Sequence, residues 1–311
     1  MNPQQNVTQW MNEEMLIPEN IDLSAYMSSE DKYKIKNAPE FREQLKEHYL
    51  NPQQAQGLTL PWIAAKDFRI RPGESTIHTG YNGHRKSMML GLIQLALIGQ
   101  DAVCLGVSLE MRPHITLDRM LKQFTGDKEP NLSTHDRYFE FLNQKLFLYD
   151  QVGTVKWQRA LAVARYAIEK LGVTQVFYDS LMKLGIKKKD LETQAEFVDE
   201  MTTLGKDTGA HFHLVAHSNK PAEYNENKAP TKYDISGSSD LSNMVDNVVV
   251  HFKESRPEKA YSQLMIVEKQ RNPSGNDPEP AISFDFDDDN LQFQRDHMRY
   301  RPDDWELARW S

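Results

Sequence analysis

The segment from Arg71 to Leu92, RPGESTIHTGYNGHRKSMMLGL, constrains the fold more than any other part of the chain. Ser75–Thr79 predicts a short strand, a glycine-containing loop follows, and Lys-Ser opens a helix expected over Lys86–Gly99. A strand that enters a helix through such a loop points backbone N–H groups at one spot, at the positive end of the helix. Nucleotide phosphates bind in that arrangement, so the segment predicts a nucleotide-binding α/β domain.

Each polar position of this loop has an expected task. Gly80 and Gly83 allow the tight turn, and Lys86 reaches the β- and γ-phosphates. Ser87 holds Mg²⁺ through its hydroxyl. Together with Asn82, these residues are expected to bind ATP or another nucleoside triphosphate.

Arg85 departs from the usual pattern, G-x-x-x-x-G-K followed by Ser or Thr, because it stands where the last glycine belongs. Its side chain could crowd the phosphates or force another backbone angle. It could also point away, or add its positive charge beside the phosphates. The alternative for the whole segment is an ordinary strand-to-helix turn.

From about Leu58 onward, strand-like runs alternate with helical patterns, which predicts a mostly parallel sheet with helices on both faces. The last three strand-like runs follow one another without helices and predict antiparallel additions at one edge. Further strands are expected over Ala102–Leu109, Gln144–Tyr149, Thr174–Tyr178, Phe212–Ala216, Val248–Phe252, Leu264–Val267 and Ile282–Phe286. Further helices are expected over Ile115–Phe124, Val155–Leu171 and Leu191–Leu204.

Residues 1–57 are interpreted as an N-terminal arm with a linker helix, and residues 58–311 as one domain. Ser29–Leu50 is charged and favours a helix, with Ser28 or Ser29 as its cap. Its apolar residues are sparse, so the helix either leans on another surface or forms a solvated arm.

Composition excludes several classes of protein. The chain has 311 residues, 39% hydrophobic and 26% charged, enough for a sizeable core. No apolar run approaches the roughly 20 residues that span a bilayer, and the polar N-terminus does not resemble a secretory signal. Cys104 is the single cysteine, a buried thiol by its apolar neighbours, so a cytoplasmic location is expected. A net charge of −8 argues against coating of nucleic acid but permits a focused basic site.

Five segments occur in the order seen in the replicative helicase family of DnaB, Twinkle and the phage primase-helicases. They read GYNGHRKS, SLEMRPHITLDRML, QVFYDS, HLVAHS and VEKQRNPSG, and the resemblance covers residues 58–295. It implies a RecA-like P-loop ATPase core that uses ATP with Mg²⁺. It also implies a homo-oligomeric ring, typically a hexamer, that moves along single-stranded DNA.

Three strand ends carry candidate catalytic residues, because ligands of open α/β sheets bind at the carboxyl edge. Glu110, one residue past a strand, is expected to orient the attacking water, although a surface Glu that caps the next turn is the alternative. Asp179 would bind Mg²⁺ through water, or merely cap a helix. His217 would sense the γ-phosphate, or serve only as a satisfied polar group.

Lys269 and Arg271 are spaced i and i+2 on or just past a strand, so both side chains point to the same side. The resemblance implies that this pair reaches the ATP of a neighbouring subunit, with Arg271 as the arginine finger and Lys269 in support. Isolated monomers would then hydrolyse ATP poorly. The alternative is a pair of solvated charges, and the family's R-G-S pattern is missing near Ser236.

Two lysine-bearing loops follow the strands that end at Asp179 and His217, and they are expected to contact DNA phosphates without base readout. The alternative is a solubilising surface. Tyr224 and Tyr233 are the only aromatic candidates for stacking. The lysines are Lys183, Lys187, Lys188 and Lys189 in the first loop, and Lys220, Lys228 and Lys232 in the second.

Three functions remain open from the sequence. The first is a hexameric, phage-type DNA helicase whose primase or polymerase comes from another chain. The second is a recombinase or circadian-clock type of RecA ATPase. The third is a nucleotide-binding but impaired regulator or loading partner of a helicase, for which Arg85 is the main support. The acidic run at Asp285 and Asp287–Asp289 is interpreted as an exposed edge strand rather than a metal site.

Overall fold

The computed structural model divides the chain into two compact units, Met1–Pro52 and Gln53–Ser311. The structure describes residues 36–50, 57–220, 227–237, 240–256, 258–259, 261–272, 280–295 and 299–300. In the first unit, a 3-10 helix η2 (Ala38–Phe41) precedes α3 (Arg42–Leu50). The expected helix thus begins at residue 38 within this part, and its residues 29–35 lie outside the described range. The domain boundary at residue 57 stays a prediction.

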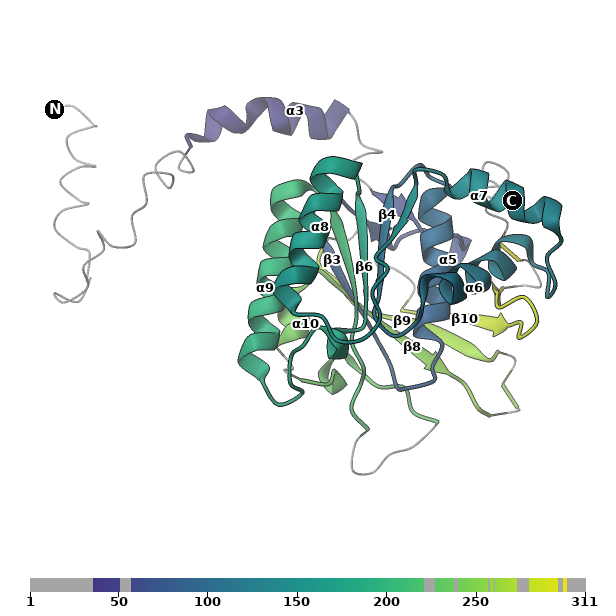
Figure 1. The fold of residues 1–311 in the computed structure, drawn as a ribbon. Coiled ribbons are helices and arrows are strands. Elements are labelled where there is room, and N and C mark those ends of the chain that lie inside the picture. Colours follow the sequence, from purple (N-terminus) through teal and green to yellow (C-terminus); the bar gives the residue numbers. More distant parts are fainter. Residues whose placement is uncertain are drawn as a thin grey trace, which may run out of the picture. The chain divides into compact units, whose positions relative to one another are not determined.

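The second unit is built on a sheet of nine strands among the described residues, in the order β11-β10-β9-β8-β3-β7-β6-β4-β5 (Figure 1). The six strands from β8 to β5 are parallel, and β9, β10 and β11 add to the β8 edge antiparallel. The expected mixed sheet is therefore confirmed. The strands are β3 (Ser75–Thr79), β4 (Cys104–Ser108), β5 (Leu146–Leu148), β6 (Gln175–Asp179), β7 (His211–Val215), β8 (Asn247–Lys253), β9 (Gln263–Gln270), β10 (Ala281–Phe286) and β11 (Phe293–Gln294).

Helices cover both faces of this sheet (Figure 1). One face packs against α5 (Lys86–Ile98), α6 (Pro113–Thr125) and α7 (Leu132–Leu142). The other packs against α8 (Trp157–Leu171), α9 (Leu191–Thr208) and the short α10 (Leu241–Met244). Smaller elements are β1 (Leu58–Thr59), which pairs with β2 (Arg69–Ile70), and the 3-10 helices η3 (Ile63–Ala65), η4 (Leu181–Lys183) and η5 (Lys232–Asp234).

Two expectations about elements were wrong. No helix was expected over Leu132–Leu142, yet Asn131 caps one there by accepting a hydrogen bond from the Thr134 N–H at 3.1 Å. Ala281–Phe286 was expected to be an exposed edge strand, but it lies between β9 and β11. The acidic residues beyond it hold a turn, because the Asp287 carboxylate accepts hydrogen bonds from Asn290 and Gln294.

A row of buried histidines crosses the middle of the sheet. His78 on β3 lies between His251 on β8 and His213 on β7, with ring nitrogens 3.0 Å and 3.1 Å apart. His213 continues the row to the Gln175 side-chain oxygen on β6, at 3.2 Å. A hydrogen-bonded chain of side chains therefore links four adjacent strands under α5.

A fourth buried histidine, His211, hydrogen bonds to the Thr76 hydroxyl at 2.9 Å and to the Arg71 carbonyl at 2.7 Å. Burial lowers the pKa of His78 to about 3 and the pKa of His211 to about 4. Burial also places the pKa of the other two well below the usual histidine value. All four imidazoles are consequently neutral at neutral pH.

Candidate nucleotide-binding site

The loop between β3 and α5 has the backbone shape that the sequence predicted. Gly80 has a φ of 144°, and a Cβ there would collide with the His251 carbonyl oxygen of β8. Gly83 has a φ of 79°, and a Cβ there would meet open space, so its role is conformational. The loop therefore packs closely on β8 and turns tightly before α5.

Arg85 adopts the left-handed conformation that a glycine takes most easily, with φ 58° and ψ 23°. Its side chain leaves the loop toward β10 rather than crowding it. The guanidinium carbon lies 4.0 Å from the centre of the Phe286 ring, and one nitrogen lies 3.8 Å from an Asp288 carboxylate oxygen. Of the arrangements considered for Arg85, the side chain that points away is the one observed. An impaired regulator thereby loses the support that a crowded loop would have given it.

Lys86 is buried at the first position of α5, with 6% of its surface exposed. Its ammonium donates hydrogen bonds to the carbonyls of Gly80 and Tyr81, both at 2.8 Å. Burial lowers the pKa of Lys86 to about 8, although the negative charges of Asp179 and Glu110 oppose this shift. The amine is therefore held inside the loop, where a phosphate group could replace the two carbonyls as its acceptor.

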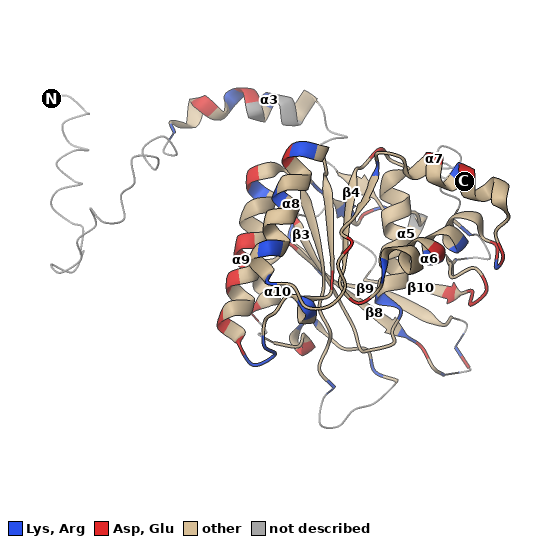
Figure 2. Cartoon of the chain, in the orientation of Figure 1, with Lys and Arg blue, Asp and Glu red and all other residues tan. Residues whose placement is uncertain are grey.

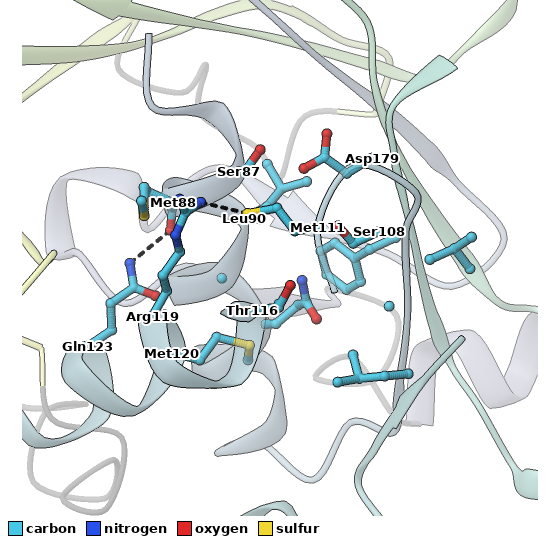
Figure 3. A pocket seen from close by; sticks show the side chains of 16 residues that line it. Ser87, Met88, Leu90, Ser108, Met111, Thr116, Arg119, Met120, Gln123 and Asp179 are labelled. Atoms are coloured by element: carbon cyan, nitrogen blue, oxygen red, sulfur yellow. Dashed lines mark hydrogen bonds between the residues drawn. The ribbon is translucent and has the colours of Figure 1, made fainter. Parts of the chain in front are cut away.

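Ser87 and Asp179 point toward one another across a pocket between α5 and α6 (Figure 3). Burial raises the pKa of Asp179, while a hydrogen bond from Ser87 acts in the opposite direction. A hydroxyl and a carboxylate on one side fit Mg²⁺, which binds few protein oxygens and takes its remaining ligands from phosphates and water. Among the described residues no group of three or more His, Cys, Asp or Glu could hold a metal alone.

Glu110 lies just past the end of β4, and its carboxylate accepts a hydrogen bond from the Ser180 hydroxyl at 2.9 Å. His217 follows β7 at the same edge of the sheet. Burial lowers the pKa of His217, and the charge of Lys86 lowers it further. The structure thus brings Glu110, Asp179 and His217 together around the amine of Lys86, as the strand ends predicted.

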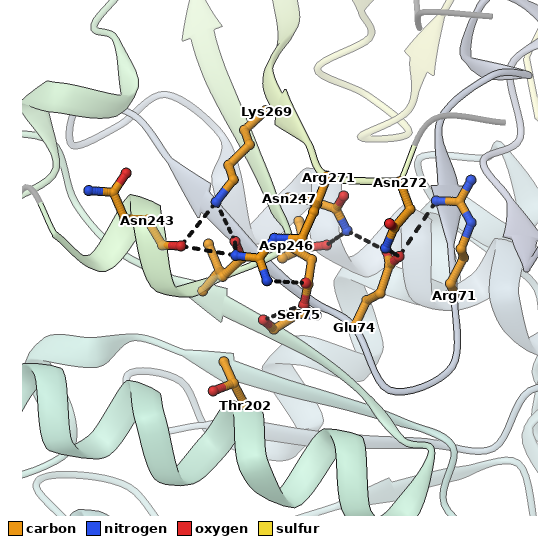
Figure 4. Close-up of polar contacts among 12 residues, drawn as sticks. Arg71, Glu74, Ser75, Thr202, Asn243, Asp246, Asn247, Lys269, Arg271 and Asn272 are labelled. Atoms are coloured by element: carbon orange, nitrogen blue, oxygen red, sulfur yellow. Dashed lines mark hydrogen bonds and ion pairs between the residues drawn. The ribbon is translucent and has the colours of Figure 1, made fainter. Parts of the chain in front are cut away.

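Lys269 and Arg271 lie elsewhere, at the opposite end of β3 from the loop (Figure 4). The backbone N–H of Arg271 donates to the Asp246 carbonyl at 2.9 Å, and the N–H of Asp246 donates to the Ser75 carbonyl at 3.1 Å. Ser75 begins β3, whereas Gly80 follows its last residue. Arg271 therefore cannot complete the phosphate site of its own chain.

The two cations share acceptors, so they point to the same side as their spacing predicted. Lys269 donates to the carbonyls of Asn243 and Val245 at 3.2 Å and 2.6 Å, and Arg271 donates to the same two carbonyls at 3.0 Å and 3.3 Å. An Arg271 nitrogen also lies 3.2 Å from an oxygen of the buried Asp246. The Arg271 side chain remains 43% exposed, so it is positioned by the chain yet accessible from outside.

Sequence reasoning missed three side chains that support this site. Asp246 and Ser180 position Arg271 and Glu110, and each follows or precedes a predicted strand, which is the signal that was available. Arg119 of α6 lines the pocket beside Asp179 and donates to the Met111 sulfur at 2.8 Å (Figure 3). The sequence signal for Arg119 was its place in the segment LDRML, which resembles the family's motif.

The loops that follow β6 and β7 carry the lysines expected to contact DNA. In the first loop Lys187, Lys188 and Lys189 are exposed, and they stand out in blue near the end of α9 (Figure 2). In the second loop Lys220 and Lys228 are exposed, and Tyr233 is 70% exposed beside Lys232. Tyr224 lies outside the described residues. Both loops leave the carboxyl edge of the parallel sheet, where the phosphate loop also lies.

Comparison with known proteins gives few matches in sequence and a clear one in fold. No protein-family model matches the chain. A segment of 205 residues, 59% of the chain, is 25% identical to the Twinkle homolog protein, chloroplastic/mitochondrial, of Arabidopsis thaliana, and it spans only 28% of that protein. Among solved structures, the ATPase domain of a helicase matches with a TM-score of 0.68 at 14% identity, over 81% of this chain and 97% of that domain.

The fold is the RecA-like ATPase fold. The predicted fold class is thereby confirmed, and the resemblance to DnaB/Twinkle-like replicative helicases is supported by sequence and fold alike. The RecA-like fold also accounts for the layout described above, because it places the phosphate loop and the ends of β4, β6 and β7 at one edge of the sheet. None of the helices in the described ranges is long and apolar enough to cross a membrane.

Proposed function

We propose that this chain is the motor subunit of an ATP-dependent DNA helicase, a ring that moves along single-stranded DNA and hydrolyses ATP between subunits. One observation carries the proposal: the phosphate loop and Arg271 occupy opposite ends of β3. A subunit with its phosphate-binding residues at one end and its exposed arginine at the other completes each site only beside a neighbour. Repetition of that contact closes a ring, with six subunits expected.

The side chains around the loop supply the groups that phosphoryl transfer needs. Glu110 would orient the attacking water and accept its proton, while the bond from the γ-phosphorus to ADP breaks. Lys86 and Arg271 of the partner subunit would neutralise the charge that develops on the transferred phosphoryl group. Bound Mg²⁺, held through Ser87 and Asp179, supplies further charge neutralisation at the phosphate oxygens. His217 would report the γ-phosphate to the loop that follows it.

The lysine loops would carry the DNA. Phosphate contacts need cations and no base readout, so little sequence preference is expected. A cytoplasmic location and a primase or polymerase supplied by another chain remain part of the proposal. A recombinase-type ATPase shares the core, but the similarity to a Twinkle homolog favours the helicase.

The proposal is tested by phosphate release from Mg²⁺-ATP with and without single-stranded DNA, together with unwinding of a forked duplex. We expect DNA to stimulate turnover by about tenfold or more, within the roughly 1–10³ s⁻¹ range of typical enzymes. ATP binding without turnover under both conditions would instead support an impaired regulator or loading partner.

Replacing both Lys187 and Lys188 with Ala is expected to weaken binding to a single-stranded oligonucleotide about tenfold. The slope of log affinity against log salt should fall by about 1.4, because each lost phosphate contact removes roughly 0.7 on single strands. Lys170→Ala with Lys206→Ala is the matched control, since these exposed lysines lie near the carboxyl ends of α8 and α9. An unchanged slope in the first variant would remove this loop from the DNA path.

Arg85→Gly is expected to leave ATP turnover within about threefold of the unmodified chain, because the side chain lies over Phe286 and away from the loop. Relief of the left-handed backbone, worth about 1–2 kcal/mol, is offset by the lost contact with the ring and by the flexible unfolded state of glycine. Arg85→Ala keeps the strain and loses the contact, so it should melt at a lower temperature than Arg85→Gly. A rise in turnover above tenfold in Arg85→Gly would show that the side chain obstructs the phosphates.

A further inference from the structure

The first basic loop is built as an ordered structure on α9. Leu181, Leu184 and Ile186 are buried under it, with 5%, 0% and 8% of their surfaces exposed. Asp190 then caps α9 by accepting a hydrogen bond from the Thr193 N–H at 3.1 Å. The exposed lysines of this loop are thus attached to the core through the residues between and around them.

Gln194, one turn into α9, ties this loop to the helix. It is a buried polar side chain with 4% of its surface exposed. Its amide nitrogen donates to the carbonyl of Lys187 at 3.2 Å and to the carbonyl of Lys188 at 3.0 Å. The backbone that carries two of the expected DNA contacts is therefore held by one amide group.

The other end of the Gln194 amide faces the second loop. Its oxygen occupies the place where a Cβ of Gly237 would lie, and Gly237 has a φ of 118°. No described residue donates a hydrogen bond to this buried oxygen. Gln194 and Ser236 also line a pocket of about 420 Å³ together with residues of the first loop. The side chain is thus wedged between the two loops.

The residues beside Gly237 are joined to the end of β7. The Ser236 N–H donates to the His217 carbonyl at 2.7 Å, and Ile235 bridges to Ser218. The Asn219 N–H donates to the Asp234 carbonyl at 2.7 Å. A displacement of His217 would therefore move Ser236 and Gly237 with it, and so press on or release the Gln194 amide.

From this geometry we propose that Gln194 is a positioning residue that couples His217 at the ATP site to the first DNA-binding loop. The path runs through the His217 carbonyl, Ser236 and Gly237 to the amide of Gln194, and from there to the carbonyls of Lys187 and Lys188. The inference rests on the proposed function for the role of the loop in binding DNA. The coupling itself, from nucleotide to loop, is a property of this chain that can be measured without DNA.

Gln194→Met tests the coupling, because Met keeps the length of the side chain and removes both the donor and the acceptor. A fluorescent dye is attached through Met182→Cys, a residue of the first loop that is 56% exposed, while the single native cysteine, Cys104, is fully buried. A non-hydrolysable ATP analogue is then added without DNA. We expect a signal change in the otherwise unmodified chain and a change about tenfold smaller with Gln194→Met. DNA stimulation of turnover should fall by a similar factor.

Two further variants keep the test decisive if Gln194→Met folds poorly. Gly237→Ala would displace the amide from the other side and should reproduce the loss, whereas Thr202→Val is the matched control. Thr202 is buried on the same helix, but its hydroxyl donates only to the Asp199 carbonyl at 2.9 Å. Thermal melts establish that each variant is folded.

The outcomes separate this inference from the proposed function. A full dye response in folded Gln194→Met and Gly237→Ala overturns the coupling, as does the absence of any response in the unmodified chain. A response that depends on Gln194, in a chain whose turnover ignores DNA, supports the coupling and counts against the helicase.

Discussion

Replacing Arg271 with Ala is expected to lower ATP turnover by roughly 10³-fold or more, the effect that an arginine finger has on phosphoryl transfer. The affinity for ATP should stay within about threefold, because Arg271 lies at the far end of β3 from the loop that binds the phosphates of its own chain. Turnover is measured by phosphate release and affinity by the fluorescence of a labelled nucleotide. A large loss of affinity with a proportional loss of turnover would contradict a role in trans.

Two controls separate this role from a structural one. Arg271 also pairs with Asp246, whose carboxylate accepts a hydrogen bond from the Ser75 N–H at 2.9 Å, so its removal could disturb the start of β3. Arg271→Lys keeps the charge near Asp246 but loses the planar group that binds two oxygens at once, so it should fold and still turn over slowly. Arg165→Ala, which removes an exposed arginine of α8, should be fully active.

Acidification is the second large effect. The folded chain keeps His78, His211, His213 and His251 neutral, whereas each would take up a proton in the unfolded chain below about pH 6.5. Folded stability contributed in this way is complete above that value. It is lost as the pH falls toward the lowered pKa values of the folded state, which are about 4 for His211 and about 3 for His78.

Four protons lower the free energy of unfolding by roughly 5 kcal/mol per pH unit in that window. Since native stability is about 5–15 kcal/mol, the domain should unfold between about pH 5 and pH 4. The measurement is chemical denaturation from pH 8 to pH 5, followed by circular dichroism. His211→Gln should reduce the slope by about one proton, or roughly 1.4 kcal/mol per pH unit. The exposed His114, replaced by Gln, should leave the slope as it was. A stability that stays flat from pH 6.5 to pH 5 would contradict the neutral row.

Periodicity was sufficient for most of the sheet, because each buried strand is a short apolar run between turn signals. Ser75–Thr79 was predicted residue for residue, and the other strands of the parallel part lie within a few residues of their predicted bounds. Leu132–Leu142 was missed because its apolar spacing is weak and only its Asn131 cap marks the start. The edge position assigned to Ala281–Phe286 was wrong because pairing partners are set by the fold rather than by the alternation of one strand.

The candidate site was predictable wherever a residue ends a strand, since parallel strands bring their carboxyl ends to one edge. That rule gathers Glu110, Asp179 and His217 around Lys86. It could not show which way the Arg85 side chain points, because that depends on Phe286, about two hundred residues away in the sequence. The contacts of Gln194 were hidden for the same reason, since they join a helix to two loops.

Mixing two inactive variants tests most directly whether a triphosphate bound at one subunit is completed by an arginine from the next. Lys86→Ala damages the phosphate loop and Arg271→Ala damages the finger, so each variant alone should release almost no phosphate. In an equimolar mixture with subunit exchange, about one interface in four joins an intact loop to an intact finger. The account predicts that turnover returns in the mixture. A mixture that assembles and binds ATP but stays as inactive as its components would contradict it.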